Sequence, residues 1–208
     1  LAYGYVLQGG LSQYNIVGAP VLDGDEGCYL LPVKETTGYA QAALTEPWAC
    51  VTASYDVSYR SSWKLDGQVA IVAGPAAACC CTKLGKPYIA GRAPASVTTF
   101  GLSGALLEEI RALAVADGFE LVEKGAASEE ALAGIDAQSY DDIVLLGADP
   151  ALYETMEVYA AKGGMINLVG GSKLDTPAPV DVGRLHYDNL ALVGTNSNVI
   201  ADGYRPIR

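Results

Sequence analysis

The amino-acid sequence predicts a doubly wound α/β fold, in which a parallel sheet of six strands is covered by helices on both faces. Three observations predict it. From Gln68 onward, short β-branched runs alternate with helical stretches, which is typical of parallel sheets. The run Ile143-Val144-Leu145-Leu146 fits a strand buried on both faces. Hydrophobic residues make up 50% of the 208 positions, so a sizeable core can form.

The six strands are expected at residues 69–73, 96–99, 119–123, 142–147, 165–169 and 190–194. Helices are expected from the cap Ser103 to Gly118, from the cap Ser128 to Ile135, and from Pro150 to the pair Gly163-Gly164. Six is also the number of strands in a dinucleotide-binding sheet, so the expected fold is Rossmann-like. We assign it to residues 67–208.

Residues 1–66 differ in composition, because they are rich in Gly, Tyr and Pro, and their apolar residues show little helical periodicity. We interpret them as a remnant of a catalytic domain, with a strand-like start at residues 1–7 and a connecting helix. Because the chain opens on Leu1 without a lead-in, we expect a trimmed fragment.

The formal net charge of -11 argues against nucleic acid and anionic membrane surfaces as partners, since both need clustered Lys and Arg. No apolar run reaches the roughly 18–20 residues that span a bilayer. The five cysteines form no C-x-x-C pair, so we interpret them as small buried thiols in a reducing cytoplasm.

Ligands of doubly wound sheets bind outside the carboxyl ends of the strands, where glycine allows close approach and helix N-termini favour phosphate. The residues at these ends are our candidate cofactor-binding residues: Gly74, Pro75, Ala76, Ala77, Thr99, Ser103, Gly147, Ala148, Gly170 and Gly171. The alternative for each glycine is that a turn requires it.

The dinucleotide fingerprint G-x-G-x-x-G is incomplete, because residues 72–77 read V-A-G-P-A-A and keep only the middle glycine. No Asp or Glu occurs from Gly67 to Leu107 to hold the adenosine ribose, and that window holds three cations, Lys83, Lys86 and Arg92. This window therefore favours a cofactor whose ribose carries a 2′-phosphate over one whose 2′-hydroxyl is bound by an acid. That no dinucleotide binds at all stays open.

A catalytic zinc site needs about three protein ligands, and the single histidine, His186, has no partner at ligand spacing. We therefore name no metal ligand, and His186 is interpreted as a structural or surface histidine. Glu46, a carboxylate among apolar neighbours, is the one catalytic candidate, and an ordinary acid at a helix start is its alternative.

Five segments together resemble the medium-chain, zinc-type alcohol and polyol dehydrogenases, closest to the branch of sorbitol dehydrogenase and sorbose-phosphate reductase. They are Gly9-Gly10-Leu11-Ser12-Gln13-Tyr14, the A-L-T-E-P-W-A-C-V of residues 43–51, and residues 141–147, 163–171 and 184–194. The resemblance covers nearly the whole chain in the right order.

The resemblance implies NAD or NADP as cofactor, a small alcohol or polyol as substrate, and zinc in the full enzyme. It places Glu46 beside the catalytic zinc and Gly74-Pro75 in the pyrophosphate loop. The family's zinc-ligand segments are missing, so we expect a cofactor domain that is not competent alone. A non-catalytic structural module and a different α/β enzyme are the alternatives. In this superfamily the sixth strand pairs across a dimer axis, so we expect a homo-oligomer.

Overall fold

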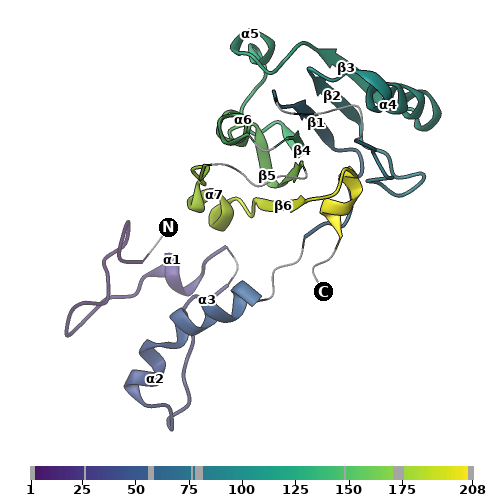
Figure 1. The fold of residues 1–208 in the computed structure, drawn as a ribbon. Helices are drawn as coiled ribbons and strands as arrows, with labels where there is room; N and C mark the ends of the chain where they lie inside the picture. The colour runs from purple at the N-terminus through teal and green to yellow at the C-terminus, as the bar shows by residue number, and fades with distance from the viewer. Residues whose placement is uncertain are drawn as a thin grey trace. The chain divides into compact units, whose positions relative to one another are not determined.

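The protein is described by a computed structural model that covers residues 3–25, 27–55, 59–75, 77, 82–147, 149–170 and 176–205. The chain divides into two compact units, Leu1–Val57 and Ser58–Arg208 (Figure 1). The candidate residues Ala76, Ala148 and Gly171 lie outside the described residues.

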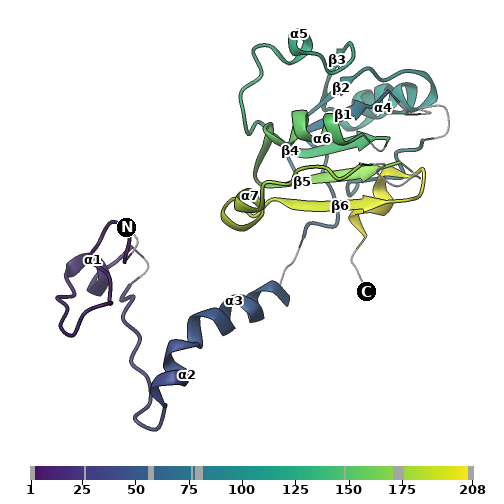
Figure 2. The same ribbon diagram turned by 60° about the vertical axis from the view of Figure 1, so that its left-hand side comes forward.

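Unit 2 contains one six-stranded sheet in which every pairing is parallel. The strands are β1 (Gln68–Ala73), β2 (Ser96–Phe100), β3 (Glu120–Lys124), β4 (Tyr140–Leu146), β5 (Ala160–Val169) and β6 (Ala191–Thr195). Their spatial order is β3-β2-β1-β4-β5-β6, visible from top to bottom in Figure 2. This is the strand order of a Rossmann fold, and it confirms the predicted fold class.

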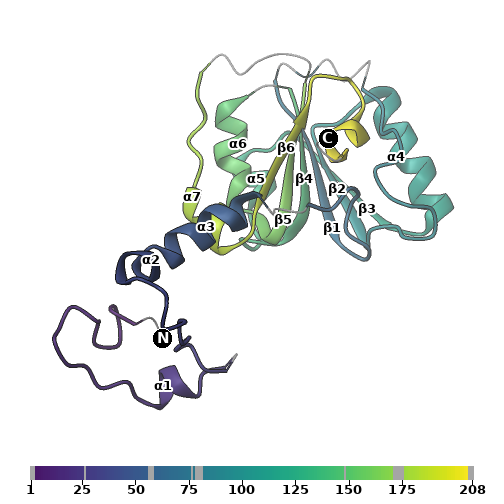
Figure 3. The same cartoon turned by 90° about the horizontal axis from the view of Figure 1, so that it is seen from below.

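Helices cover both faces of the sheet (Figure 3). On one face, α4 (Gly104–Asp117) and the 3-10 helix η2 (Ile200–Tyr204) pack over a core that includes Ile71, Val97 and Val144. On the other face, α5 (Glu129–Leu132) and α6 (Pro150–Glu157) pack over a second core. The change of face follows from right-handed crossovers, because the chain moves outward from β1 to β3 and then returns to β4.

Two predicted helices are shorter than expected. Ala133 already has an extended ψ of 131°, so α5 ends at Leu132 and not at Ile135. The helix that starts at Pro150 ends at Glu157, and the pair Gly163-Gly164 lies inside β5. Gly163 has a φ of +67° beside an irregularity in the β4–β5 register, so this glycine serves a bend in a strand.

The connection from β1 to β2 has no helix among its described residues, which are 74, 75, 77 and 82–95. Instead, Leu84 and Tyr88 are buried against the sheet. The Tyr88 ring stacks on Trp63 at 5.6 Å between centroids, and the Trp63 amide donates to the carbonyl of Pro87 at 2.7 Å. An extended segment therefore covers the face that a crossover helix covers in most Rossmann folds.

We did not predict the short helix that precedes β6. Helix α7 (Val182–Tyr187) is started by Asp181, whose carboxylate accepts from the amides of Gly183 and Arg184. An Asp at this position is an N-cap signal that the sequence contained.

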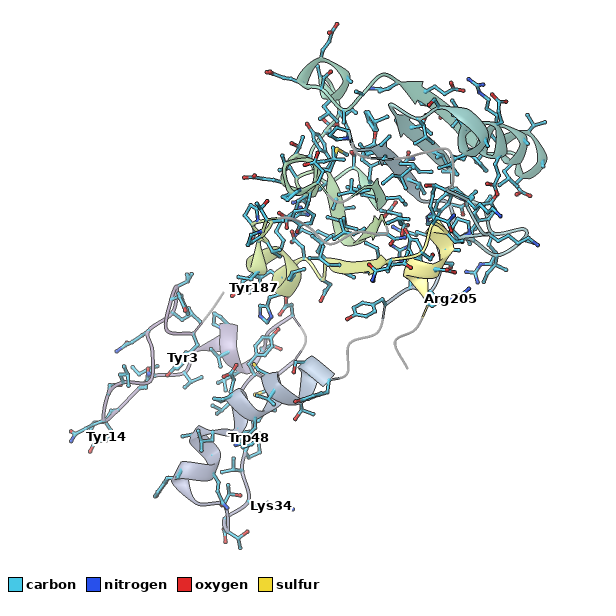
Figure 4. All side chains as sticks on the ribbon, viewed as in Figure 1. Tyr3, Tyr14, Lys34, Trp48, Tyr187 and Arg205 are labelled. Carbon is cyan, nitrogen blue, oxygen red and sulfur yellow. The ribbon has the colours of Figure 1, made fainter. Side chains whose placement is uncertain are left out.

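Unit 1 contains α1 (Ala19–Leu22), α2 (Tyr39–Ala43) and α3 (Thr45–Tyr55), and none of these helices has a buried residue. Among its described residues no strand forms: Tyr3 and Leu7 make only an isolated bridge where a strand was expected. A strand needs a continuous partner, and this unit offers none within those residues. Tyr3, Tyr14 and Trp48 are exposed on it (Figure 4).

Two of the thiols that we interpreted as buried, Cys28 and Cys50, are exposed. The helices of their unit have no buried residues, so the described part of that unit forms no core that could cover them. The other three, at residues 79–81, lie outside the described residues. No helix in the described part of the chain is long and apolar enough to cross a membrane.

Candidate functional site

A cleft of 710 Å³ opens at the carboxyl ends of the strands in unit 2. The tip of β1, the turns after β2 and β3, and the first turns of α6 line it. Its lining residues are Ala73, Gly74, Pro75, Ala77, Gly101, Ser103, Ala126, Ala127, Asp149, Ala151, Leu152 and Thr155. The cleft therefore lies at the edge where doubly wound folds bind ligands, beside the point where the strand order reverses.

Gly74 forms the floor of the cleft where β1 meets β4. A Cβ atom on Gly74 would lie 2.9 Å from the carbonyl oxygen of Leu146 and 3.7 Å from the Cβ of Asp149. The Gly74 amide donates to that same Leu146 carbonyl at 2.8 Å. Glycine is required here because two strand ends approach each other closely, whether or not a ligand is present.

The loop after β1 uses its own backbone donors. The Gly74 amide is bonded to Leu146, Pro75 has no N–H, and the Ala77 amide donates to the Gly74 carbonyl at 3.0 Å. Among its described residues, this loop presents no free amide to a pyrophosphate. The described part of this loop therefore does not fit the pyrophosphate of NAD(P).

The only charged side chain among the described lining residues is Asp149, the N-cap of α6. Its Oδ1 accepts from the amides of Ala151 and Leu152 at 3.0 and 3.2 Å. These two bonds use backbone amides at the start of α6 that could otherwise bind an anion. The carboxylate also adds negative charge to the cleft, so the start of α6 does not attract an anion.

Small residues form the wall near β2 and β3. Gly101 has a φ of +64°, and a Cβ there would lie 3.2 Å from the Cα of Ala126. The Gly101 amide donates to the carbonyl of Lys124 at 3.1 Å. Ser103 stands at the N-cap position of α4 as predicted, but its side chain makes no capping hydrogen bond. This wall therefore presents mainly backbone and small side chains to the cleft.

The cleft brings together four predicted residues: Gly74, Pro75, Ala77 and Ser103. Three others lie elsewhere. Thr99 is buried within β2, whereas Gly147 and Gly170 continue the sheet through bonds to Val169 and Thr195.

The sequence did not lead us to name four other lining residues of the cleft, which are Ala126, Ala127, Leu152 and Thr155. Small residues after a strand carry no signal of their own. The Asp149-Pro150 pair, an N-cap before a first-turn proline, could have indicated that α6 borders the site.

The three cations that we expected to favour a 2′-phosphate are not among the described residues that line the cleft. They are Lys83, Lys86 and Arg92. Lys83 lies beside Val199, and its carbonyl accepts from the amide of Ile200 at 2.9 Å. Lys124 is the last residue of β3, and its Nζ donates to the Ala131 carbonyl at 2.9 Å and lies 5.8 Å from the centre of the Phe100 ring.

Glu46 lies on α3 in unit 1, whereas the cleft belongs to unit 2. The Cys50 thiol donates to Glu46 Oε1 at 3.0 Å, and this bond raises the pKa of Cys50. The described residues contain no group of three His, Cys, Asp or Glu side chains that could hold a metal ion, so zinc does not fit them. His186 packs its ring edge-on against Tyr187 on α7.

Comparison with known proteins finds no matching family model. The chain is 27% identical over 227 aligned residues to the uncharacterised protein YggP of Escherichia coli (strain K12), covering 96% of this chain and 51% of that protein. It is 25% identical over 219 residues to the mannitol-1-phosphate 5-dehydrogenase of Aliivibrio fischeri, again covering 96% and 51%. The chain thus spans about half the length of these curated relatives.

A solved structure that the chain matches is the glucose dehydrogenase of Haloferax mediterranei in complex with NADP, zinc and gluconolactone. That match has a TM-score of 0.40 and 19% identity, and covers 79% of this chain and 43% of the other. The 2R,3R-butanediol dehydrogenase of Bacillus subtilis matches with a TM-score of 0.39 and 17% identity, covering 78% and 44%.

Proposed function

We propose that unit 2 is the nucleotide-binding domain of an NAD(P)-dependent oxidoreductase that acts on a small alcohol or polyol, with the cleft as the site of the adenosine part of the cofactor. The observation that carries the proposal is the cleft itself. It lies at the strand tips of a sheet with Rossmann strand order, and small or apolar side chains form most of its wall.

The relatives support the substrate class. One of the two curated relatives bears the name of a dehydrogenase of a polyol phosphate and aligns with nearly the whole chain. Because the described residues hold no zinc site and the loop after β1 uses its own amides, we propose no catalytic step for the chain alone. The cytoplasm remains the compartment that we expect.

Binding of the cofactor can be measured by thermal unfolding of the full chain with NADP, NAD or adenosine. A ligand that binds only the folded state raises the unfolding free energy, by about 2.7 kcal/mol at a concentration 100-fold above its Kd. We expect a concentration-dependent rise in Tm with at least one dinucleotide. An unchanged Tm with all three ligands at millimolar concentration would overturn the proposal.

A second candidate function is a structural module that joins copies of the chain through β6. This strand is the last in the sheet order and pairs only with β5 within the described residues. An open strand edge is a template for pairing with another chain. We expect the protein to sediment as a dimer at micromolar concentration, and a monomer throughout that range would contradict the assignment of β6 as an interface.

A further inference from the structure

A carboxylate borders the cleft at the place where a Rossmann fold usually holds phosphate. Asp149 follows β4 as the N-cap of α6, and a Cβ atom on Gly74 would lie 3.7 Å from its own Cβ. Gly74 comes directly after β1, and the loop after the first strand of a dinucleotide-binding sheet is the one that receives the pyrophosphate. Asp149 therefore lies beside that loop, with a charge of the same sign as a phosphate.

The start of α6 has no free donor to offset this charge. Pro150 has no N–H, and the amides of Ala151 and Leu152 donate to Asp149 Oδ1 at 3.0 and 3.2 Å. The amide of Tyr153 donates to the backbone carbonyl of Asp149 at 3.1 Å. The first four residues of the helix thus leave no N–H group for an anion, although helix N-termini commonly bind one.

The other parts of this end of the cleft do not supply a compensating group either. The loop after β1 has no free amide among its described residues, and no lysine or arginine is among the described residues that line the cleft. A phosphate placed here would meet a carboxylate without a cation beside it. Such an arrangement is unfavourable because like charges repel and the phosphate gives up bonds to water.

A neutral group with hydrogen-bond donors suits the same carboxylate. Both amide bonds of Asp149 use Oδ1, so Oδ2 can accept from a ligand, and the residue is partly exposed. A carboxylate only accepts hydrogen bonds, so it pairs with hydroxyl and amino groups and not with phosphate oxygens. Adenosine carries several such donors and no charge.

We propose that Asp149 is a specificity-determining residue of the cleft, which selects the uncharged adenosine part of a ligand and repels its phosphates. Phosphate groups then weaken binding, in contrast to the usual Rossmann site, where a helix N-terminus holds them. The inference rests on the proposed function, because it takes the adenosine part of the cofactor as the occupant of the cleft.

The expected effect is several-fold in Kd. Two like charges about 4 Å apart in water repel each other with an energy equivalent to about fivefold in an equilibrium constant. We therefore expect Kd to rise at least about threefold from adenosine to adenosine 5′-monophosphate, and to rise further with ADP. Salt screens this repulsion, so the differences should be large at about 0.01 M ionic strength and small at about 1 M.

The test is isothermal titration calorimetry of the full chain with these three ligands at both ionic strengths. Asp149→Asn removes the charge and keeps a good N-cap, because Asn and Asp rank together at this position. We expect the variant to bind ADP at least about threefold more tightly than the parent chain at low salt, and to bring the Kd values of ADP and adenosine closer together.

Asp181→Asn is the matched control. Asp181 caps α7 through the same pair of bonds, from the amides of Gly183 and Arg184, and it is not among the described residues that line the cleft. The control changes the net charge by the same amount as Asp149→Asn, so it should leave the ratio of the two Kd values at its value in the parent chain.

Three outcomes would overturn the inference. Tighter binding of ADP than of adenosine would mean that the phosphates find donors elsewhere, such as the uncapped start of α4, and would leave the proposed function standing. The same ratio in the parent chain and Asp149→Asn, or an equal change in Asp181→Asn, would remove the role of Asp149. If none of the three ligands binds at millimolar concentration, the proposed function fails together with the inference.

Discussion

Replacing Gly203 by alanine is expected to lower the unfolding free energy of unit 2 by about 3 kcal/mol. Gly203 is buried in η2, and a Cβ atom there would lie 2.0 Å from Asn167 Oδ1 and 2.6 Å from its Cγ. Asn167 has no room to give way, since it is fully buried on β5 and its Nδ2 donates to the Ile200 carbonyl at 2.9 Å. Turning the amide aside breaks that bond and leaves a buried donor unsatisfied.

Chemical denaturation measures this loss, and Gly125→Ala is the matched control. A Cβ on Gly125 meets nothing within 4 Å, and its φ is not positive, so the control should be close to neutral. A double-mutant cycle with Asn167→Ala gives the sharper test, because removing the amide removes the clash. An equal loss for Gly203→Ala with and without the Asn167 side chain would contradict this explanation.

Placing tryptophan at Ala151 is expected to weaken dinucleotide binding at least about tenfold, or about 1.4 kcal/mol. Ala151 is exposed in the first turn of α6 and lines the cleft, so an indole there fills space that the ligand needs. The backbone amide of Ala151 that bonds to Asp149 is unchanged by the substitution, so the N-cap of α6 is retained.

Isothermal titration calorimetry with the dinucleotide that raises the Tm of the parent chain measures the effect. Glu154→Trp is the control, because Glu154 is exposed on the same helix and is not part of the cleft lining. Equal affinities in the parent chain and Ala151→Trp would place the ligand elsewhere. Equal losses in both tryptophan variants would point to damage to α6 and not to a blocked cleft.

The sheet was predictable because its signals are local. Runs such as residues 143–146 are buried on both faces, and each strand was expected within a few residues of its place except β5, which starts five residues early at Ala160. A glycine pair looked like a helix stop because sequence alone does not distinguish a strand irregularity from a turn. The short α5 is different, because the sequence contains its stop signal: Gly134, directly after Ala133, has a φ of +79° in the turn that ends the helix.

The site was predictable only in outline. The candidate cleft lies at the strand tips, where a ligand was expected, and Gly74, Pro75, Ala77 and Ser103 line it. The sequence had no means of showing that the Gly74 and Ala77 amides are already bonded. It also suggested three cations for a phosphate, and none of them lines the cleft, since only the path of the chain decides where a lysine ends up.

The sequence by itself determined the class of fold, because alternation and burial patterns depend on neighbouring residues and on the handedness of the crossovers. Only the tertiary structure decided the contacts between distant segments and the lining of the cleft. Arg60 and Asp142 are 82 residues apart and lie 2.8 Å from each other, and the cleft walls come from β1, from the turns after β2 and β3, and from α6. Contacts of this kind depend on which segments the sheet order brings together, and no pattern within a segment records them.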